Sequence, residues 1–142
     1  MLALICAAIL MFIAGFHFYW GFGGTAGLAV AVPQSESGAA LFKPSAAAAH
    51  LIGLALVAAA LCVLAWSGRF ALPLPPVALR AIVAFLALVF TARALAWFRY
   101  AGLFKKVRNT AFGRYDTFFY CPLCLFLGLG LFYLVAKPGL TR

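Results

Sequence analysis

The sequence predicts an all-α integral membrane protein, a four-helix bundle built from two transmembrane hairpins in a single domain. Apolar residues make up 68% of the 142 residues and charged residues only 9%, whereas soluble domains average about 45–50% apolar and about 25% charged. Four apolar stretches are each long enough for a helix that crosses a hydrocarbon core of about 30 Å. Membrane-spanning strands are not expected, because the alternating pattern of a β-barrel is absent.

The first helix is expected at about residues 1–22, a stretch without a charged side chain. It ends in the aromatic run Phe18-Tyr19-Trp20, which is typical of a membrane interface. A secretory signal peptide would need basic residues before its apolar core, and the first basic residue is Lys43. We therefore expect this segment to remain in the protein as a helix.

The second helix is expected at about residues 45–67. Pro44 and Ser45 are typical of a helix start, with the serine as the cap. Ala49 and Gly53 stand four residues apart, so they share a face on which a neighbouring helix can pack closely.

The remaining two helices are expected at about residues 76–100 and 117–136, separated by a basic loop at about 101–116. Prolines precede the third helix, and the run Lys137-Pro138-Gly139 ends the fourth. The first and third helices both end in aromatic residues followed by glycine, which favours two similar hairpins.

Five of the eleven basic residues crowd the connection between the third and fourth helices: Arg99, Lys105, Lys106, Arg108 and Arg114. Short loops rich in Lys and Arg stay in the cytoplasm, so this connection is predicted to be cytoplasmic, with both termini outside. Lys137 and Arg142 oppose this bias without reversing it.

Each of the four predicted helices carries polar residues near its cytoplasmic end, at the membrane face where the basic loop is predicted. An arginine within the hydrocarbon costs about 2.5–3.5 kcal/mol on insertion scales, which favours a partner unless the side chain snorkels to the surface. Asp116 is the one acid at this depth, so we predict that it pairs with Arg93 or Arg99. Each of the two histidines is expected to make an interhelical hydrogen bond.

These residues form the predicted binding site, which suits an anionic or amphiphilic ligand such as a lipid headgroup. Its members are basic, aromatic or hydrogen-bonding side chains near the cytoplasmic face: His17, Tyr19, Trp20, Lys43, His50, Arg93, Trp97, Arg99, Lys105, Lys106, Arg108, Arg114, Asp116 and Tyr120.

The pair Cys121 and Cys124 has the Cys-x-x-Cys spacing of redox dithiols at a helix start. Helix count and this motif resemble quinone-linked disulfide-forming enzymes of the vitamin K epoxide reductase type. The pair is predicted at the reducing cytoplasmic face, however, and Cys6 and Cys62 are predicted near the other end of their helices. Thiol-disulfide chemistry therefore stays an alternative.

Other ligand classes find little support. Two cysteines and two histidines are enough for a zinc tetrahedron, but the histidines lie on different helices, so no metal and no cofactor are expected. The net charge of +9 is concentrated in a short loop between membrane helices, so nucleic-acid binding is not expected either.

Several motifs together resemble a family of small bacterial membrane proteins catalogued as domain of unknown function 3995. They include His17-Phe-Tyr-Trp20, Ala31-Val-Pro33, Phe42-Lys-Pro-Ser45, Arg93-Ala94, Phe98-Arg-Tyr-Ala-Gly102, Thr110-Ala-Phe112, Asp116-Thr117 and Tyr120-Cys-Pro-Leu-Cys124. The resemblance implies a four-helix, multi-pass protein of the bacterial inner membrane and supplies no activity. Serine is usual in the family at Cys121, threonine at His50, and an acid is frequent at Ala96, so the cysteine and histidine are not obligatory.

Two classes of function remain. The first is a non-enzymatic membrane protein that binds anionic lipids, a membrane protein partner or a second copy of itself through the basic face. The second is an enzyme or carrier for a small amphiphile. A carrier favours an ionisable group near the middle of the membrane, and no carboxylate lies there in the predicted helices.

Overall fold

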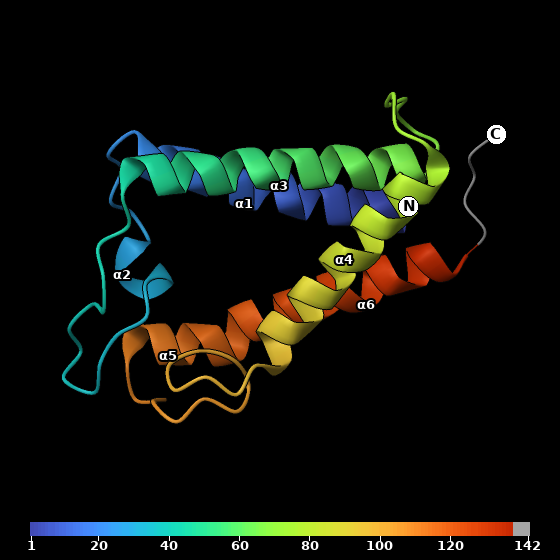
Figure 1. Cartoon of the computed structure of the whole chain (residues 1–142). Helices are drawn as coiled ribbons and strands as arrows, with labels where there is room; N and C mark the ends of the chain where they lie inside the picture. The colour runs from blue at the N-terminus through green and yellow to red at the C-terminus, as the bar shows by residue number, and fades with distance from the viewer. Residues whose placement is uncertain (138–142) are drawn as a thin grey trace.

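The computed structural model describes residues 1–137, which form a helical protein (Figure 1). Four helical segments are long and apolar enough to cross a membrane. They are α1 (Leu2–Gly21), α3 (Ala46–Trp66), α4 (Pro76–Leu95) and the continuous run Ala111–Ala136. In this part of the chain no strand forms, and one isolated bridge joins Gln34 to Ala40. The predicted all-α membrane fold is confirmed.

The helices pair as two antiparallel hairpins, as predicted. In the first, α1 packs against α3, and their connection carries the short helix α2 (Leu28–Ala31). In the second, α4 packs against α6 (Cys121–Ala136). The last membrane segment begins with α5 (Ala111–Tyr115) and the π-helical turn η1 (Asp116–Tyr120), which continue directly into α6.

Small residues let the helices of each hairpin approach closely. Ala49 and Gly53 of α3 are buried, and a β-carbon at Gly53 would lie 3.0 Å from the ring of Phe18 in α1. In the second hairpin, a β-carbon at Gly128 of α6 would collide with the hydroxyl of Thr91 in α4. The close contact predicted for Ala49 and Gly53 is therefore present.

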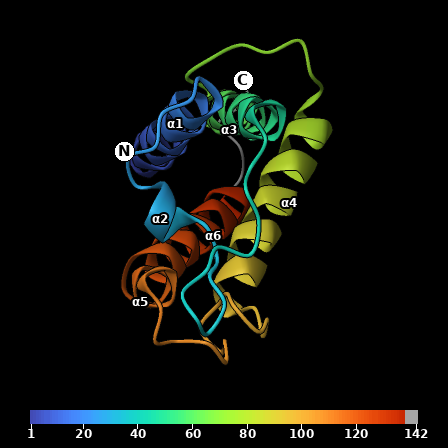
Figure 2. The ribbon, with the colours of Figure 1, turned by 90° about the vertical axis from the view of Figure 1, so that its left-hand side faces the viewer.

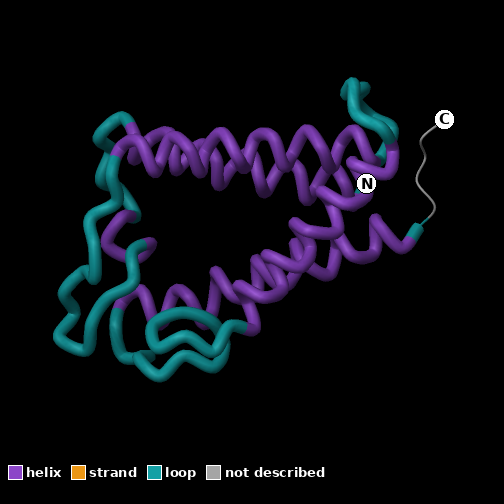
Figure 3. The backbone as a smooth tube through the Cα atoms, in the orientation of Figure 1, coloured by secondary structure: helices purple, strands orange, loops and turns teal. Residues whose placement is uncertain are grey.

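The two hairpins share a core toward only one end of the molecule, which we call the far end. It carries Met1 and the connection between α3 and α4, and Figure 3 shows the hairpins close together there. The indole Nε1 of Trp66 donates to the carbonyl of Leu134 across the hairpins at 2.9 Å. The buried cluster comprises Ala3, Cys6, Ala7, Leu10, Ala59, Ala60, Cys62, Val63, Ala65, Trp66, Leu79, Val83, Ala87, Leu127 and Leu131.

At the opposite end, which we call the loop end, the hairpins diverge and the chain connections bridge them (Figures 1 and 3). Figure 2 looks at this end and shows α2 and the chain that follows it between the hairpins. Here α2 packs against α5. The backbone N–H of Phe112 donates to Oε1 of Gln34 at 3.2 Å, and Val32 and Phe112 are buried.

The boundaries of the third and fourth helices differ from the prediction. The third helix ends at Leu95 rather than near Tyr100, because the chain reverses and the N–H of Leu103 donates to the carbonyl of Ala94 at 2.9 Å. The last segment begins at Ala111 rather than Thr117, because the hydroxyl of Thr110 accepts the N–H of Gly113 and caps it. The basic loop therefore spans residues 96–110.

The other predicted boundaries agree within a residue or two. Ser45 caps α3, accepting the N–H of Ala48 at 3.1 Å. The last helix ends at Ala136, followed by Lys137. Pro138 and Gly139, predicted to end this helix, and Arg142 lie outside the described residues.

Candidate functional site

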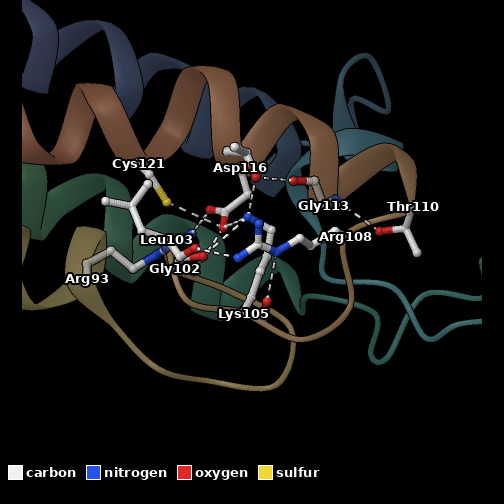
Figure 4. A network of polar contacts seen from close by, with 10 residues as sticks. Arg93, Gly102, Leu103, Lys105, Arg108, Thr110, Gly113, Asp116 and Cys121 are labelled. Atoms are coloured by element: carbon white, nitrogen blue, oxygen red, sulfur yellow. Dashed lines mark hydrogen bonds and ion pairs between the residues drawn. The ribbon is translucent and has the colours of Figure 1, made fainter.

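A fully buried carboxylate, Asp116, organises the loop end (Figure 4). Its backbone opens the turn η1, where the N–H of Cys121 reaches back five residues to the carbonyl of Asp116. Pro122 gives a reason for the wide turn, because proline has no N–H for the carbonyl of Phe118 and its ring crowds that oxygen in a regular helix. The helix thus continues across the proline.

Four groups surround the Asp116 carboxylate. Oδ1 accepts from Nη2 of Arg93 at 2.7 Å. Oδ2 accepts from the backbone N–H of Gly102 at 2.8 Å and from the thiol of Cys121 at 3.5 Å, and lies 3.1 Å from Nζ of Lys105. Of the two arginines considered as partners, Arg93 makes the predicted pair.

Lys105 is the second cation of this network, and its side chain is fully buried. Besides Asp116, its Nζ donates to Thr117 Oγ1 at 2.6 Å and to the carbonyl of Gly102 at 3.2 Å. Three acceptors therefore satisfy the three N–H groups of the ammonium. Lys105 was predicted as one of the basic residues of the binding site, and the structure places its side chain inside the ion network, away from the exposed cations.

Gly102 lets the loop reach the carboxylate. Its φ is +97°, which L side chains rarely adopt, and a β-carbon there would collide with the carbonyl of Ala96. This conformation turns the N–H of Gly102 toward Asp116. The basic loop is consequently pinned to the helices at its middle.

The buried network carries an excess of positive charge, since two cations face one carboxylate. Nη1 of Arg93 is buried and donates to no group in the described part of the chain, while the side chain as a whole is 33% exposed. Arg93 therefore retains hydrogen-bonding capacity beyond its pair with Asp116.

The remaining predicted cations form an exposed basic rim around this network. Arg99 lies 3.3 Å from Glu36 of the α1–α3 connection, and both side chains are exposed. The guanidinium of Arg108 donates to the carbonyls of Lys105 and Leu103. The other exposed cations at this end are Lys43, Lys106 and Arg114.

Aromatic side chains stand beside these cations. Trp97 and Phe104 contact each other with ring centroids 5.8 Å apart, and together with Phe98 they are exposed. Because α4 ends at Leu95, these rings lie just beyond the end of a membrane segment. The rim therefore combines apolar rings with positive charge, the combination found at bilayer interfaces.

The first hairpin contributes two histidines that stay outside the ion network. Nδ1 of His17 bonds to the carbonyl of Ile13 and Nδ1 of His50 to that of Ala46, each four residues earlier in its own helix. The prediction of interhelical hydrogen bonds was wrong, because a histidine in a helix can reach the carbonyl one turn back. His50 also packs against Phe22, with ring centroids 4.7 Å apart.

The predicted aromatic residues serve local contacts. Nε1 of Trp20 donates to the carbonyl of Ala26 at 2.9 Å, and the hydroxyl of Tyr19 accepts the N–H of Ala26 at 3.4 Å. These bonds hold the turn that follows α1. Tyr120 ends η1 and contacts Phe112, with ring centroids 6.1 Å apart.

The four cysteines are free thiols. Cys121 is fully buried and Cys124 is half-buried one turn further along α6. Cys6 and Cys62 belong to the buried cluster at the far end, as predicted. Among the described residues, no three His, Cys, Asp or Glu side chains are grouped closely enough to hold a metal ion.

Sequence reasoning missed several contributors to the site, namely Gly102, Thr110, Thr117 and Gln34. Gly102 and Thr110 carried a usable signal, because glycine favours a positive φ and threonine favours a helix cap. No sequence pattern indicated that Gln34 reaches the backbone of Phe112.

Four apolar spans with an ion network and a basic rim at one end define a polytopic α-helical membrane protein. The chain belongs to the family described as "Protein of unknown function (DUF3995)", whose profile matches residues 10–131. The predicted family resemblance is thereby confirmed. Comparisons with curated proteins and with solved structures yield no match.

Proposed function

We propose that this protein is a non-enzymatic, multi-pass protein of the bacterial inner membrane that binds anionic membrane lipids through its basic rim. The observation that carries the proposal is the juxtaposition of exposed aromatic rings and exposed cations on a loop that Asp116 pins in place. Interfacial rings anchor a loop at the headgroup level, and cations at that level attract anionic headgroups.

The charge of the molecule supports a lipid partner. Eleven basic residues stand against two acids, and both acids contact cations of the loop region. Each lysine or arginine near an anionic leaflet contributes about 1 kcal/mol of attraction. The same charge bias favours the cytoplasmic side for the loop end.

The thiol-disulfide alternative is less well supported. The thiol of Cys121 is buried and donates to Asp116, whereas reactive cysteines are partly exposed thiolates in electropositive surroundings. No carboxylate beyond the paired Asp116 and Glu36 is present in the sequence for acid-base chemistry. Lipid binding requires neither a reactive thiol nor a carboxylate that acts as an acid or base.

The proposal is tested by neutralising two rim cations whose side chains are exposed, in the double variant Lys106→Gln and Arg114→Gln. Proteoliposomes of equal phosphatidylglycerol and phosphatidylcholine are dissolved in mild detergent, and the lipids retained by the purified protein are quantified by mass spectrometry. Two contributions of about 1 kcal/mol each add to about 2 kcal/mol, so the ratio of anionic to zwitterionic lipid should fall roughly 30-fold.

The matched control is Arg69→Gln with Arg80→Gln, which removes the same charge from exposed positions nearer the far end. This variant should keep the wild-type lipid ratio. An equal fall in both double variants would show an effect of net charge alone, and an unchanged ratio in the rim variant would reject the proposed function.

A further inference from the structure

One face of the first hairpin is covered at the far end and uncovered at the loop end. Trp66, Ala59 and Ile52 are seven residues apart along α3 and therefore lie on the same side of the helix. Their exposed fractions are 6%, 5% and 47%. The second hairpin thus covers this stripe until the two hairpins diverge (Figure 3).

The stripes of the other three helices continue into the same region. Along α4, Arg93 follows Leu86, which packs against the shared core, by seven residues. On α6, Cys124 precedes the core residue Leu127 by three, and on α1, His17 follows the core residue Leu10 by seven. Such spacings place residues on one helix face. Arg93, Cys124 and His17 are each half-buried.

We call this set, His17, Ile52, Arg93 and Cys124, the inter-hairpin face. Toward the far end this face meets the apolar shared core. Among its four residues, Arg93 is the charged one. The charge there is incompletely balanced, because Asp116 is shared with Lys105 and Nη1 of Arg93 donates to no described group.

Two features favour an occupant that enters from the bilayer. Arg93 precedes the end of the membrane segment α4 at Leu95, so the face lies within the span. At the loop end, α2 and the chain after it cross between the hairpins (Figure 2), and the contact of Phe112 with Gln34 holds them there. We therefore expect an occupant to reach the face from the surrounding bilayer, as a membrane lipid would.

We propose that the inter-hairpin face holds one anionic phospholipid, with its phosphate at the guanidinium of Arg93 and an acyl chain along the stripe of Ile52. The phosphate complements the excess positive charge of the network, since guanidinium binds phosphate through paired N–H groups. Because Nη1 is buried, the Arg93 side chain must shift for the phosphate to reach this atom. The inference rests on the proposed lipid binding and assigns it a second, stoichiometric site.

The test uses Ile52→Trp, which fills the face without touching the ion network. The matched control is Leu54→Trp, because Leu54 is also exposed on α3 but lies two residues away, on another side of the helix. Protein from phosphatidylglycerol vesicles is analysed by native mass spectrometry for a single retained lipid. We expect at least a tenfold lower occupancy in Ile52→Trp and wild-type occupancy in Leu54→Trp.

A second variant, Arg93→Lys, keeps a positive charge for Asp116 but loses the planar fork that suits phosphate. In vesicles of equal phosphatidylglycerol and phosphatidylcholine, it should reduce at least fivefold the preference of the retained lipid for phosphatidylglycerol. Unchanged occupancy in Ile52→Trp or unchanged preference in Arg93→Lys overturns the inference.

The experiments distinguish lipid binding at the basic rim from lipid binding at the inter-hairpin face. The rim variant Lys106→Gln with Arg114→Gln should lower the total number of anionic lipids retained while the single tightly held lipid persists. Loss of that lipid in the rim variant, with retention in Ile52→Trp, would assign all binding to the rim and reject the inter-hairpin site.

Discussion

Nη2 of Arg93 and Oδ1 of Asp116 lie 2.7 Å apart, so the last turn of α4 is tied to the turn that leads into α6. The carboxylate is fully buried and also accepts from the loop between these two helices. One acid thereby fixes both helices and their connection.

Replacing this acid should be the most damaging single change at the loop end. Asp116→Asn keeps the shape of the side chain but leaves Arg93 and Lys105 without a counter-charge, and breaking a buried pair costs about 3–5 kcal/mol. We expect a clear fall in the thermal midpoint of the purified protein in detergent. The comparison is Glu36→Gln, which breaks the exposed pair with Arg99 and should change stability by less than about 1 kcal/mol. Equal effects of the two changes would contradict the central role of Asp116.

A methyl group at Gly102 should disrupt the loop. Gly102→Ala combines an unfavourable positive φ with a collision against the carbonyl of Ala96, and it displaces an N–H that bonds to Asp116. We expect a destabilisation of about 2–4 kcal/mol, measured by thermal unfolding. Gly23→Ala separates the two causes, because Gly23 has a φ of +94° with open space around its β-carbon position. Gly23→Ala should lower the stability by about 1 kcal/mol. An equally small loss of stability in Gly102→Ala would show that the loop relieves the collision.

The contact between α4 and α6 depends on the absence of a side chain at Gly128. In Gly128→Ala, the new methyl meets the hydroxyl of Thr91 and lies 2.9 Å from its backbone nitrogen, so the helices must move apart. Overpacking of this kind costs about 1–3 kcal/mol. Gly15→Ala is the control, because nothing lies within 4 Å of that position, and alanine favours the helix. Detergent unfolding should separate the two variants, and a neutral Gly128→Ala would contradict the close approach of these helices.

Cysteine labelling tests the orientation in the membrane. Asn109→Cys places an exposed thiol in the basic loop, and Phe70→Cys places one in the connection at the far end. Because basic loops remain cytoplasmic, a membrane-impermeant maleimide should label Phe70→Cys in intact cells and Asn109→Cys only after permeabilisation. The unsubstituted protein reports labelling of its native thiols. The reverse pattern would place the loop end outside and remove the cytoplasmic orientation from the proposed function.

Composition was enough to predict the membrane spans, because each needs only a sufficient length of apolar residues. That Asp116 pairs with either Arg93 or Arg99 was predictable for a similar reason, since few ionic groups lie near the membrane and their depths limit the choice of partner. Only the structure decides between the two arginines. Ser45 was predicted as a cap from local chemistry that does not depend on the rest of the fold.

The role of Lys105 was not predictable in this way. Three other cations lie in the same loop, and nothing in the sequence distinguishes Lys105 from them. Only the fold of the loop around Gly102 brings Lys105 to Asp116. The divergence of the hairpins was also missed. Residues on both the covered and the uncovered parts of α3 are apolar, as Ala59 and Ile52 illustrate, because lipid and protein interior favour the same side chains.

The partners of the central ion pair are 23 residues apart in the chain and belong to successive membrane segments. During biosynthesis Arg93 therefore emerges from the ribosome before the acid that neutralises it. An unpaired arginine is costly in the hydrocarbon, so the second hairpin is energetically favoured to enter the bilayer as a unit rather than helix by helix. The first hairpin has no charged residue within its two long helices and faces no such constraint on the order of its insertion.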